Sequence, residues 1–331
     1  MKSETADPGG ACGYVGANGA SCPGAAGETG LCRWHDPAIT KDAPDDRAKL
    51  ESWAQSGQSM EGFELASAAL AGVNLVKEPG TGGYDLSNAN LSHANLSDGH
   101  LYQINLRGAS LLKTNLNGAR LNDADLRGAN LLGAVLNDAR LENTVWDTVV
   151  AQEATALEDW RRGNFDSARV LFREAEEVYR NLRKAMENKG QFEQAGEFFY
   201  REMVARRWLL KRYCLKWYFS YLVDIFCGYG ENPARVVGMS VAIIFVCGLL
   251  YFLLGIGYDG AVIGVDLAKG PLVNLQNFGD SLYFSIVTFT TLGYGDIAPF
   301  GWTRVVAAVE AFAGSFILAL FVVVFVKKMT R

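Results

Sequence analysis

The sequence predicts a multidomain protein in which a membrane-embedded α-helical module follows a polar, repetitive solenoid and a short helical region. Leucine recurs at every fifth residue from 86 to 141 without a break. Two apolar runs, 236–257 and 305–326, are each long enough to cross a bilayer as helices. A short segment rich in glycine and threonine lies between these runs. We therefore expect five parts: 1–50, 51–150, 151–207, 208–234 and 235–331.

The overall composition hides this division. The chain has 331 residues, a formal net charge of −5 and a mean hydropathy of +0.05. The charge and the hydropathy are in the range of ordinary soluble proteins. The acidic balance disfavours a general nucleic-acid binder, which would carry a net basic field. No long apolar run follows a basic start within the first fifty residues, so we expect no secretory signal peptide. Nearly all long apolar runs lie after residue 235, so the averages describe neither half of the chain.

The first part carries a candidate metal site. Cys12, Cys22, Cys32 and His35 follow the spacing C-x9-C-x9-C-x2-H. Three thiolates and one imidazole complete a tetrahedral zinc site. A short segment without a hydrophobic core needs a cross-link such as a bound metal ion to fold. An odd number of cysteines in a reducing compartment argues against disulfides. The spacing resembles plant-type C-x9-C-x10-C-x2-H zinc modules, which implies a structural Zn²⁺. Unliganded cysteines in a loose tail are the alternative.

The second part repeats with a period of five residues, which fits neither an α-helix nor a flat strand. The leucines run from Leu86 to Leu141, and Trp146 continues their register. The residue two positions before each leucine is usually alanine or glycine, and such pairing of a large with a small position indicates a solenoid. Leu65, Leu70 and Leu75 have the same period in another phase. The insert 78–83 between the two stretches has turn composition and should bulge from one face.

The repeat itself resembles the A(N/D)LXX motif of pentapeptide-repeat proteins. Ala89-Asn90-Leu91 and Ala124-Asp125-Leu126 are two of its copies. The resemblance implies a right-handed quadrilateral β-helix with four pentapeptides in each coil. The leucines would form its core, and any binding role would belong to residues that point outward.

The third part reads as helices and contains a second repeat. The pattern Gly-x-Phe, Ala, Phe occurs over 163–172 and again over 190–199. This pattern resembles the turn and second helix of tetratricopeptide repeats (TPRs), in which small alanines let two helices approach closely. Its spacing of 27 residues, from 163 to 190, is shorter than the family's. We expect TPR-like helical hairpins whose repeated residues pack the core, with docking of a peptide partner as the alternative.

The fourth part mixes basic and aromatic residues. From Trp208 to Phe226, lysine and arginine alternate with leucine, tryptophan, tyrosine and phenylalanine. Such a composition suits an amphipathic helix that lies in the inner membrane interface. Its basic side chains could attract anionic lipids. Simple anchoring of the following membrane span is the alternative.

The fifth part contains the two expected membrane spans. Residues 236–257 include no charged residue and would extend about 33 Å as a helix. Residues 305–326 contain one carboxylate, Glu310, which should have a partner because an unpaired carboxylate is costly within a membrane. Between the spans, 278–296 fits a re-entrant helix and a loop, which a membrane tolerates only when protein buries them.

The loop of this module reads TLGYGD over residues 291–296. It resembles the selectivity filter of potassium channels, with Leu292 where valine is commoner. The resemblance implies that K⁺ exchanges its hydration shell for the carbonyl oxygens and the threonine hydroxyl of the filter. Glycine is needed where the backbone adopts conformations closed to other residues. The implied ion-conducting residues are Thr291, Leu292, Gly293, Tyr294 and Gly295.

Five further residues are expected to support the filter or its opening. Thr290 and Asp296 flank it, and we predict that Tyr283 holds Asp296, because Val287 stands where some relatives carry a glutamate. Glu310 is expected to hydrogen-bond behind the re-entrant helix. Gly314 resembles the inner-helix glycine hinge of gated potassium channels, and close packing of helices explains it equally well.

Assembly and orientation follow from the same module. One filter loop cannot enclose an ion, so we expect a homotetramer around the pore axis. Basic residues precede the first span and follow the second, so both termini should be cytoplasmic in a multi-pass protein of the cell membrane. No helix carries arginine at every third position, so we expect no voltage sensor.

The sequence therefore predicts a potassium-selective, passively conducting channel, modulated by its N-terminal parts through an unidentified cytoplasmic ligand or protein. The alternative is a membrane-anchored pentapeptide-repeat interaction protein, of a DNA-mimic or scaffold type. We expect no enzyme, because the chain has no Walker loop, nucleophile elbow or HExxH motif. We expect no nucleic-acid partner either. The first 230 residues contain no nucleotide-, calcium- or dinucleotide-binding motif, so the sequence does not identify the gating stimulus.

Overall fold

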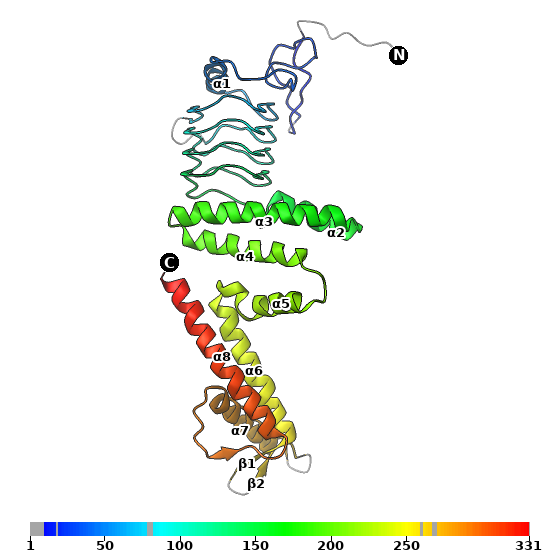
Figure 1. Cartoon of the computed structure of the whole chain (residues 1–331), viewed down its shortest axis with the longest axis vertical. Coiled ribbons are helices and arrows are strands. Elements are labelled where there is room, and N and C mark those ends of the chain that lie inside the picture. The colour runs from blue at the N-terminus through cyan, green and yellow to red at the C-terminus, as the bar shows by residue number, and fades with distance from the viewer. Residues whose placement is uncertain (1–9, 18, 78–81, 259–260, 267–269, 331) are drawn as a thin grey trace. The chain divides into compact units, whose positions relative to one another are not determined.

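The computed structural model describes residues 10–17, 19–77, 82–258, 261–266 and 270–330. The chain divides into two compact units, and the boundary falls after Lys211 (Figure 1). Each unit is described by itself below.

The first unit begins with a small module of loops. Two antiparallel bridges, Ala11↔Ala25 and Val15↔Ser21, hold these loops together, and helix α1 (Asp46–Gln55) follows them. The module packs on the first coil of the solenoid through aromatic rings: Trp34 stacks on Phe63, with ring centroids 5.6 Å apart. It therefore covers the open end of the solenoid, as terminal caps do in repeat proteins.

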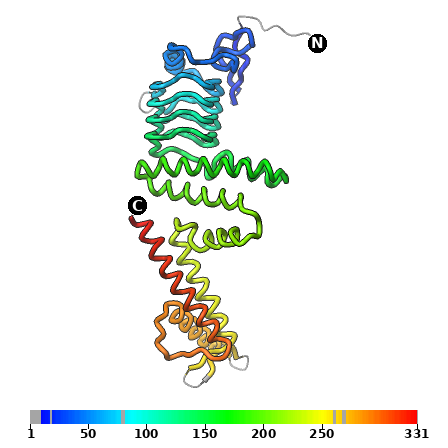
Figure 2. Tube along the Cα trace, in the orientation of Figure 1, coloured from blue at the N-terminus to red at the C-terminus, as the bar shows by residue number. Residues whose placement is uncertain are grey.

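The solenoid is a stack of coils held by parallel bridges (Figure 2). The bridges Asp85↔Asn105 and Asn105↔Asp125 join residues 20 apart, so each coil contains four pentapeptides. The leucines at every fifth position from Leu86 to Leu141 lie inside, none of them more than 7% exposed. Each pentapeptide turns through a residue with positive φ, and several of these are Asn or Asp, which tolerate the left-handed region.

The insert 78–83 increases the sequence separation between the bridged residues of the first two coils by the length of the insert. The bridges Glu64↔Asn90 and Ala69↔Asn95 join residues 26 apart, six more than the later bridges, and the insert has six residues. The leucines at 65, 70 and 75 are therefore buried in the same core as those after the insert. The expected bulge falls largely on residues 78–81, which lie outside the described part of the chain.

Three helices follow the last coil: α2 (Ala151–Arg162), α3 (Phe165–Asn188) and α4 (Phe192–Leu209). The long helix α3 packs against both α2 and α4. The contact with the solenoid is part polar and part aromatic: the Val150 amide donates to the Tyr179 hydroxyl at 3.0 Å, and Trp146 meets Phe198 edge to face. Helices therefore cover the second open end of the solenoid.

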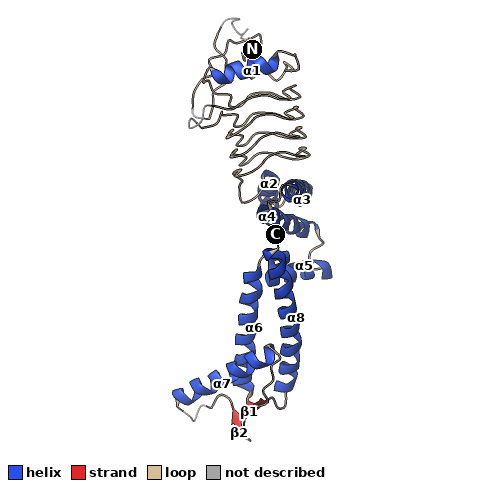
Figure 3. Ribbon diagram, turned by 90° about the vertical axis from the view of Figure 1, so that its left-hand side faces the viewer, coloured by secondary structure: helices blue, strands red, loops and turns tan. Residues whose placement is uncertain are grey.

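The second unit contains helices α5 (Leu215–Cys227), α6 (Pro233–Leu254), α7 (Pro271–Phe289) and α8 (Thr303–Met329), with a single 3₁₀ turn at Gly228–Gly230 (Figure 3). Strands β1 (Ile256–Tyr258), β2 (Ala261–Ile263) and β3 (Ile297–Ala298) form an antiparallel sheet in the order β2-β1-β3. Helices α6 and α8 are long and apolar enough to span a membrane, with mean hydropathies of 2.6 and 2.5. Helix α7 packs against both of them.

Helix α7 begins earlier than the sequence led us to expect. Residue 278 was the expected start, but the helix begins at Pro271, after the extended Gly270. Proline is favoured at a first helical position, because its missing N–H has no partner there in any case. Polar residues such as Asn274 and Asn277 interrupt the apolar pattern in the first two turns and concealed this part of the helix.

Candidate functional site

The TLGYGD loop is held at both of its ends. On one side it continues the last turn of α7, where the amide of Thr291 donates to the Thr288 carbonyl and that of Leu292 donates to the Val287 carbonyl, each at 3.0 Å. On the other side β3 pairs with β1, with Ile297 opposite Tyr258. The C-terminal, negative end of the α7 dipole therefore faces the beginning of the loop, where it favours a cation.

The backbone of the loop alternates between positive and negative φ. Thr291, Gly293 and Gly295 have φ of 58°, 56° and 81°, while Leu292 and Tyr294 between them are not in that region. Glycine adopts this region without steric cost, but a β-branched residue rarely does. Alternation of this kind turns successive carbonyl groups towards one side of the chain. A strained Thr291 in such a row marks a backbone shaped for function.

Asp296 and Tyr283 lie together at the far end of the loop. The Tyr283 hydroxyl of α7 donates to Asp296 Oδ2 at 2.9 Å. The structure thus brings together the two residues that the sequence analysis paired. Thr290, the other flanking residue, caps α7 and donates through its hydroxyl to the Ile286 carbonyl at 2.7 Å.

We expect a Tyr283→Phe chain to inactivate at a rate that differs from the wild type by about fivefold, because one hydrogen bond of about 1 kcal/mol no longer holds the loop. The decay of ionic current through the reconstituted protein measures this rate. Tyr218→Phe removes an exposed hydroxyl on α5 and serves as the control. Equal decay in wild type and Tyr283→Phe would show that the bond does not hold the loop.

Glu310 of α8 is the centre of a polar cluster inside the helical bundle. Its side chain is 2% exposed. The Ser285 hydroxyl of α7 donates to Oε1 at 2.5 Å, and the Tyr251 hydroxyl of α6 donates to Oε2 at 2.6 Å. Three helices therefore meet at one carboxyl group. The sequence analysis required a partner for Glu310 but missed Ser285 and Tyr251, although polar residues within apolar helices were the available signal.

Glu310→Leu should destabilise the protein, whereas Glu310→Gln should be mild. Leucine leaves the buried Tyr251 hydroxyl without its acceptor, at about 1–3 kcal/mol, while the Ser285 hydroxyl can still donate to the Ile244 carbonyl at 2.9 Å. Glutamine has nearly the same volume and keeps an acceptor for Tyr251. Thermal melting of the detergent-solubilised protein, followed by size-exclusion chromatography, measures the difference. Equal melting of the two variants would contradict a stabilising role for this cluster.

Two glycines let α6 and α8 approach α7 closely. A Cβ atom on Gly314 would lie 2.1 Å from the Phe289 carbonyl oxygen, and one on Gly248 would lie 2.6 Å from a methyl group of Leu282. Gly314 therefore has a packing role at the end of α7, directly before the loop. The sequence analysis did not identify a packing role for Gly248, although glycine inside a helix is unfavourable and is usually retained for packing.

Two ion pairs tie the segments before α6 to the spans. Arg235, at the start of α6, donates to Asp224 of α5 at 2.7 Å, and Lys327, near the end of α8, lies 2.5 Å from Glu231. Asp224 is buried, so its charge requires this partner. The sequence analysis counted Arg235 among the basic residues before the span but did not anticipate Asp224.

In the first unit, the structure gathers the four candidate metal ligands. The Sγ atoms of Cys12, Cys22 and Cys32 and one ring nitrogen of His35 lie within 4.8 Å of one another, and all four residues are buried. The sulfurs of Cys22 and Cys32 are 3.8 Å apart, and Nδ1 of His35 is 3.3 Å from Cys32 and 3.6 Å from Cys12. Bonds of about 2.3 Å from Zn²⁺ to sulfur at tetrahedral angles place two sulfurs about 3.8 Å apart.

The surroundings of His35 favour a metal ligand. Nε2 lies 2.9 Å from the Glu61 carbonyl, which assigns the ring proton to Nε2 and leaves Nδ1 free to face the sulfurs. The Tyr14 ring stacks on the imidazole at 3.8 Å. Burial lowers the pKa of His35 and raises the pKa of the Cys32 thiol to about 12. The lowered pKa of His35 favours the neutral imidazole, which is the form that binds a metal.

Comparisons with known proteins agree with both units. Residues 252–331 match a family described as "Ion channel", and residues 85–123 and 114–145 match "Pentapeptide repeats" in eight copies. No curated protein matches the chain.

Several solved structures are similar to the solenoid. Rfr23, a pentapeptide repeat protein from the cyanobacterium Cyanothece 51142, is 34% identical over 27% of this chain and 60% of its own, with a TM-score of 0.19. The pentapeptide repeat protein alr5209 from Nostoc Pcc 7120 is 35% identical over 28% of this chain and 72% of its own, with a TM-score of 0.21. This protein is thus a fusion of a two-transmembrane, pore-loop segment of the ion channel family with a pentapeptide-repeat domain.

Proposed function

We propose that this protein is a potassium-selective channel that conducts passively through the loop 291–295. The observation that carries this proposal is the alternation of φ at Thr291, Gly293 and Gly295, directly beyond the negative end of α7. A row of carbonyl oxygens that face one side can replace the water around K⁺.

Flux measurements test this proposal. The full-length protein, purified and reconstituted into liposomes, should conduct K⁺ in strong preference to Na⁺, and Ba²⁺ should block the K⁺ flux. Equal permeation of the two ions through wild-type protein would exclude a potassium-selective filter.

The conducting form we propose is a homotetramer in the cell membrane, with both termini in the cytoplasm. The filter loop is exposed on a single chain, with Leu292 and Tyr294 exposed to 59% and 67%, and four copies would enclose it. Phe312 and Phe316 on α8 are also exposed and can face a neighbouring chain or lipid. Helix α5 exposes several apolar side chains, which suits a helix in the inner interface beside anionic lipids.

We also propose a structural Zn²⁺ on Cys12, Cys22, Cys32 and His35. The four ligand atoms are buried and lie within 4.8 Å of one another, and the sulfurs of Cys22 and Cys32 are 3.8 Å apart, as two sulfurs on a tetrahedral zinc are. Such an ion would replace the core that this small module does not have.

For the remaining N-terminal parts we propose the finer architecture that the resemblances imply: a right-handed quadrilateral β-helix and TPR-like hairpins in α2 to α4. We propose that these parts modulate opening, and the ion pairs Arg235–Asp224 and Lys327–Glu231 connect α5 and the following turn to both spans. The same open probability in the full chain and in a chain without residues 1–150 would exclude such modulation.

The second candidate function is that of a membrane-anchored interaction protein, which the match to pentapeptide repeats supports. A DNA mimic requires a continuous acidic surface. Here Arg107 and Arg127 both pair with Asp125, at 2.9 Å and 2.5 Å, and interrupt such a surface. We therefore prefer the channel, and absence of any K⁺ flux from correctly assembled protein would favour the alternative.

A further inference from the structure

One side of the solenoid differs from the other three in the residues that its bridges align. On three sides the bridged positions carry mostly Asn, Asp or Ser, and their side chains hydrogen-bond along the column, as Asn105 does to Asp85 at 2.8 Å and Asn115 to Asn95 at 3.1 Å. On the fourth side the bridges Asn74↔His100, His100↔Arg120 and Arg120↔Arg140 align one histidine and two arginines. This column, His100–Arg120–Arg140, is the cationic column.

The cationic column contributes backbone bridges to the solenoid, but its two guanidinium groups bind nothing within the described part of the chain. No ion pair or side-chain hydrogen bond joins the guanidinium of Arg120 or Arg140 to another residue that the structure describes. Neighbouring coils are about 4.8 Å apart, and like charges directly opposite each other on adjacent strands are destabilising. By contrast, Arg107 and Arg127 share the carboxylate of Asp125. The two exposed arginines are thus arranged for an anion that comes from outside the chain.

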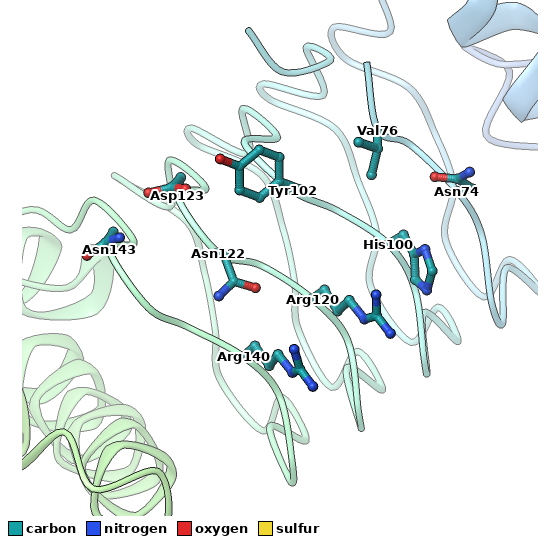
Figure 4. Close-up of a pocket in the computed structure, with 9 residues that line it drawn as sticks. All are labelled: Asn74, Val76, His100, Tyr102, Arg120, Asn122, Asp123, Arg140 and Asn143. Carbon is teal, nitrogen blue, oxygen red and sulfur yellow. The ribbon is translucent and has the colours of Figure 1, made fainter. Parts of the chain in front are cut away.

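A cavity of about 560 Å³ lies over this column. Figure 4 shows His100, Arg120 and Arg140 in one row along the solenoid, with Asn122 and then Tyr102 and Asp123 further along the coils. Tyr102 is 41% exposed, so its ring is available to a ligand. The neighbouring Asp123 carboxylate raises the pKa of the Tyr102 hydroxyl, so this hydroxyl stays protonated. The cavity therefore has a cationic side and a side with an aromatic ring, an amide and a carboxylate.

We propose that this cavity binds a soluble organic phosphate of about the size of a mononucleotide. Its phosphate groups would lie on Arg120 and Arg140, whose guanidinium groups suit bidentate contact with phosphate oxygens. Its planar group would stack on Tyr102, and its hydroxyl or amino groups would donate to Asp123. Asp123 lies at the turn that follows Arg120 on the same coil, and both residues line the cavity. The cavity volume lies in the usual range for small-molecule sites.

Binding of a fluorescent nucleotide tests this inference. Full-length protein in detergent is titrated with N-methylanthraniloyl-ATP in 0.15 M KCl, and the change of fluorescence gives the dissociation constant. Saturable binding that inorganic pyrophosphate displaces and adenosine does not displace is the expected result. The measurement needs no ion conduction, so its outcome is independent of the proposed channel function.

The variant Arg120→Gln/Arg140→Gln should weaken binding by about 30-fold or more, since two charge-assisted contacts are lost. The control Arg161→Gln/Arg162→Gln removes the same charge from α2, outside the cavity, and should bind as the wild type does. Tyr102→Ser should weaken binding, whereas Tyr102→Phe should retain most of it. Because Arg120 and Arg140 are exposed, the variants should melt at the wild-type temperature.

Three outcomes would overturn the inference. The first is no saturable binding up to about 1 mM, a concentration at which even weak specific sites fill. The second is equal weakening by the cavity variant and its control, which would indicate a general charge effect. The third is displacement by short-chain phosphatidylglycerol but not by pyrophosphate, which would assign the site to a lipid headgroup.

Discussion

A Gly293→Ala channel is expected to assemble normally and to lose potassium permeation. Gly293 has a φ of 56°, and a Cβ atom there would meet nothing within 4 Å in one chain, so the cost comes from the backbone and not from a collision. A residue other than glycine in this region costs about 1–2 kcal/mol, and four copies in a tetramer would cost about 4–8 kcal/mol. The loop would relax by turning its carbonyl groups, and the row of oxygens would be lost.

Potassium flux into liposomes measures this effect, with size-exclusion chromatography to show that the oligomer is intact. Gly279→Ala is the matched control, because Gly279 lies inside α7, has ordinary helical φ and also leaves open space around an added Cβ. Alanine is favoured over glycine in a helix, so the control should conduct as the wild type does. Undiminished K⁺ flux through Gly293→Ala would show that the loop 291–295 is not the conducting filter.

Removal of zinc is expected to unfold the module that precedes the solenoid. Structural zinc supplies an apparent 10–16 kcal/mol, roughly, to small domains at neutral pH, more than such a module can gain from its own core. Cys32→Ser should therefore abolish zinc binding and expose the backbone amides of residues 10–36 to hydrogen exchange. The aromatic contact of Trp34 with Phe63 should be lost with it.

Metal analysis and hydrogen exchange of the purified chain measure these effects. Wild-type protein prepared without chelator should contain one zinc per chain, and Cys32→Ser should contain none. Cys214→Ser is the matched control, because Cys214 lies at the N-cap of α5, is not one of the four candidate ligands, and serine is a good N-cap residue. Wild-type protein without zinc, or with unchanged exchange after chelation, would refute a structural metal.

Several features of the fold were predicted from the sequence because each depends on a short, regular pattern. The five-residue period of leucine identified the solenoid, and the matches to pentapeptide repeats confirm that family. Two charge-poor runs and the segment between them identified the membrane module, and the match to an ion channel family confirms it. In both cases the signal lies in neighbouring residues, where periodicity and composition report directly on burial.

Other features could not be predicted because they depend on residues that are distant in the chain. Ser285 and Tyr251 reach Glu310 from helices whose rotation the sequence does not specify. The start of α7 at Pro271 was obscured by polar residues that the apolar pattern does not include. The packing role of Gly314 became clear only when α8 was seen against the Phe289 carbonyl.

The sequence by itself determined the order of the parts, the identity of the loop residues and the set of cysteines and histidine, because these are properties of consecutive residues at fixed spacing. The tertiary structure alone decided which side chains meet. It brought the four candidate metal ligands to within 4.8 Å of one another, placed three helices around Glu310 and aligned His100, Arg120 and Arg140 on one side of the solenoid. The physical reason is that long-range contacts depend on the register between coils and on the rotation of packed helices, which the whole core fixes together and no local pattern records.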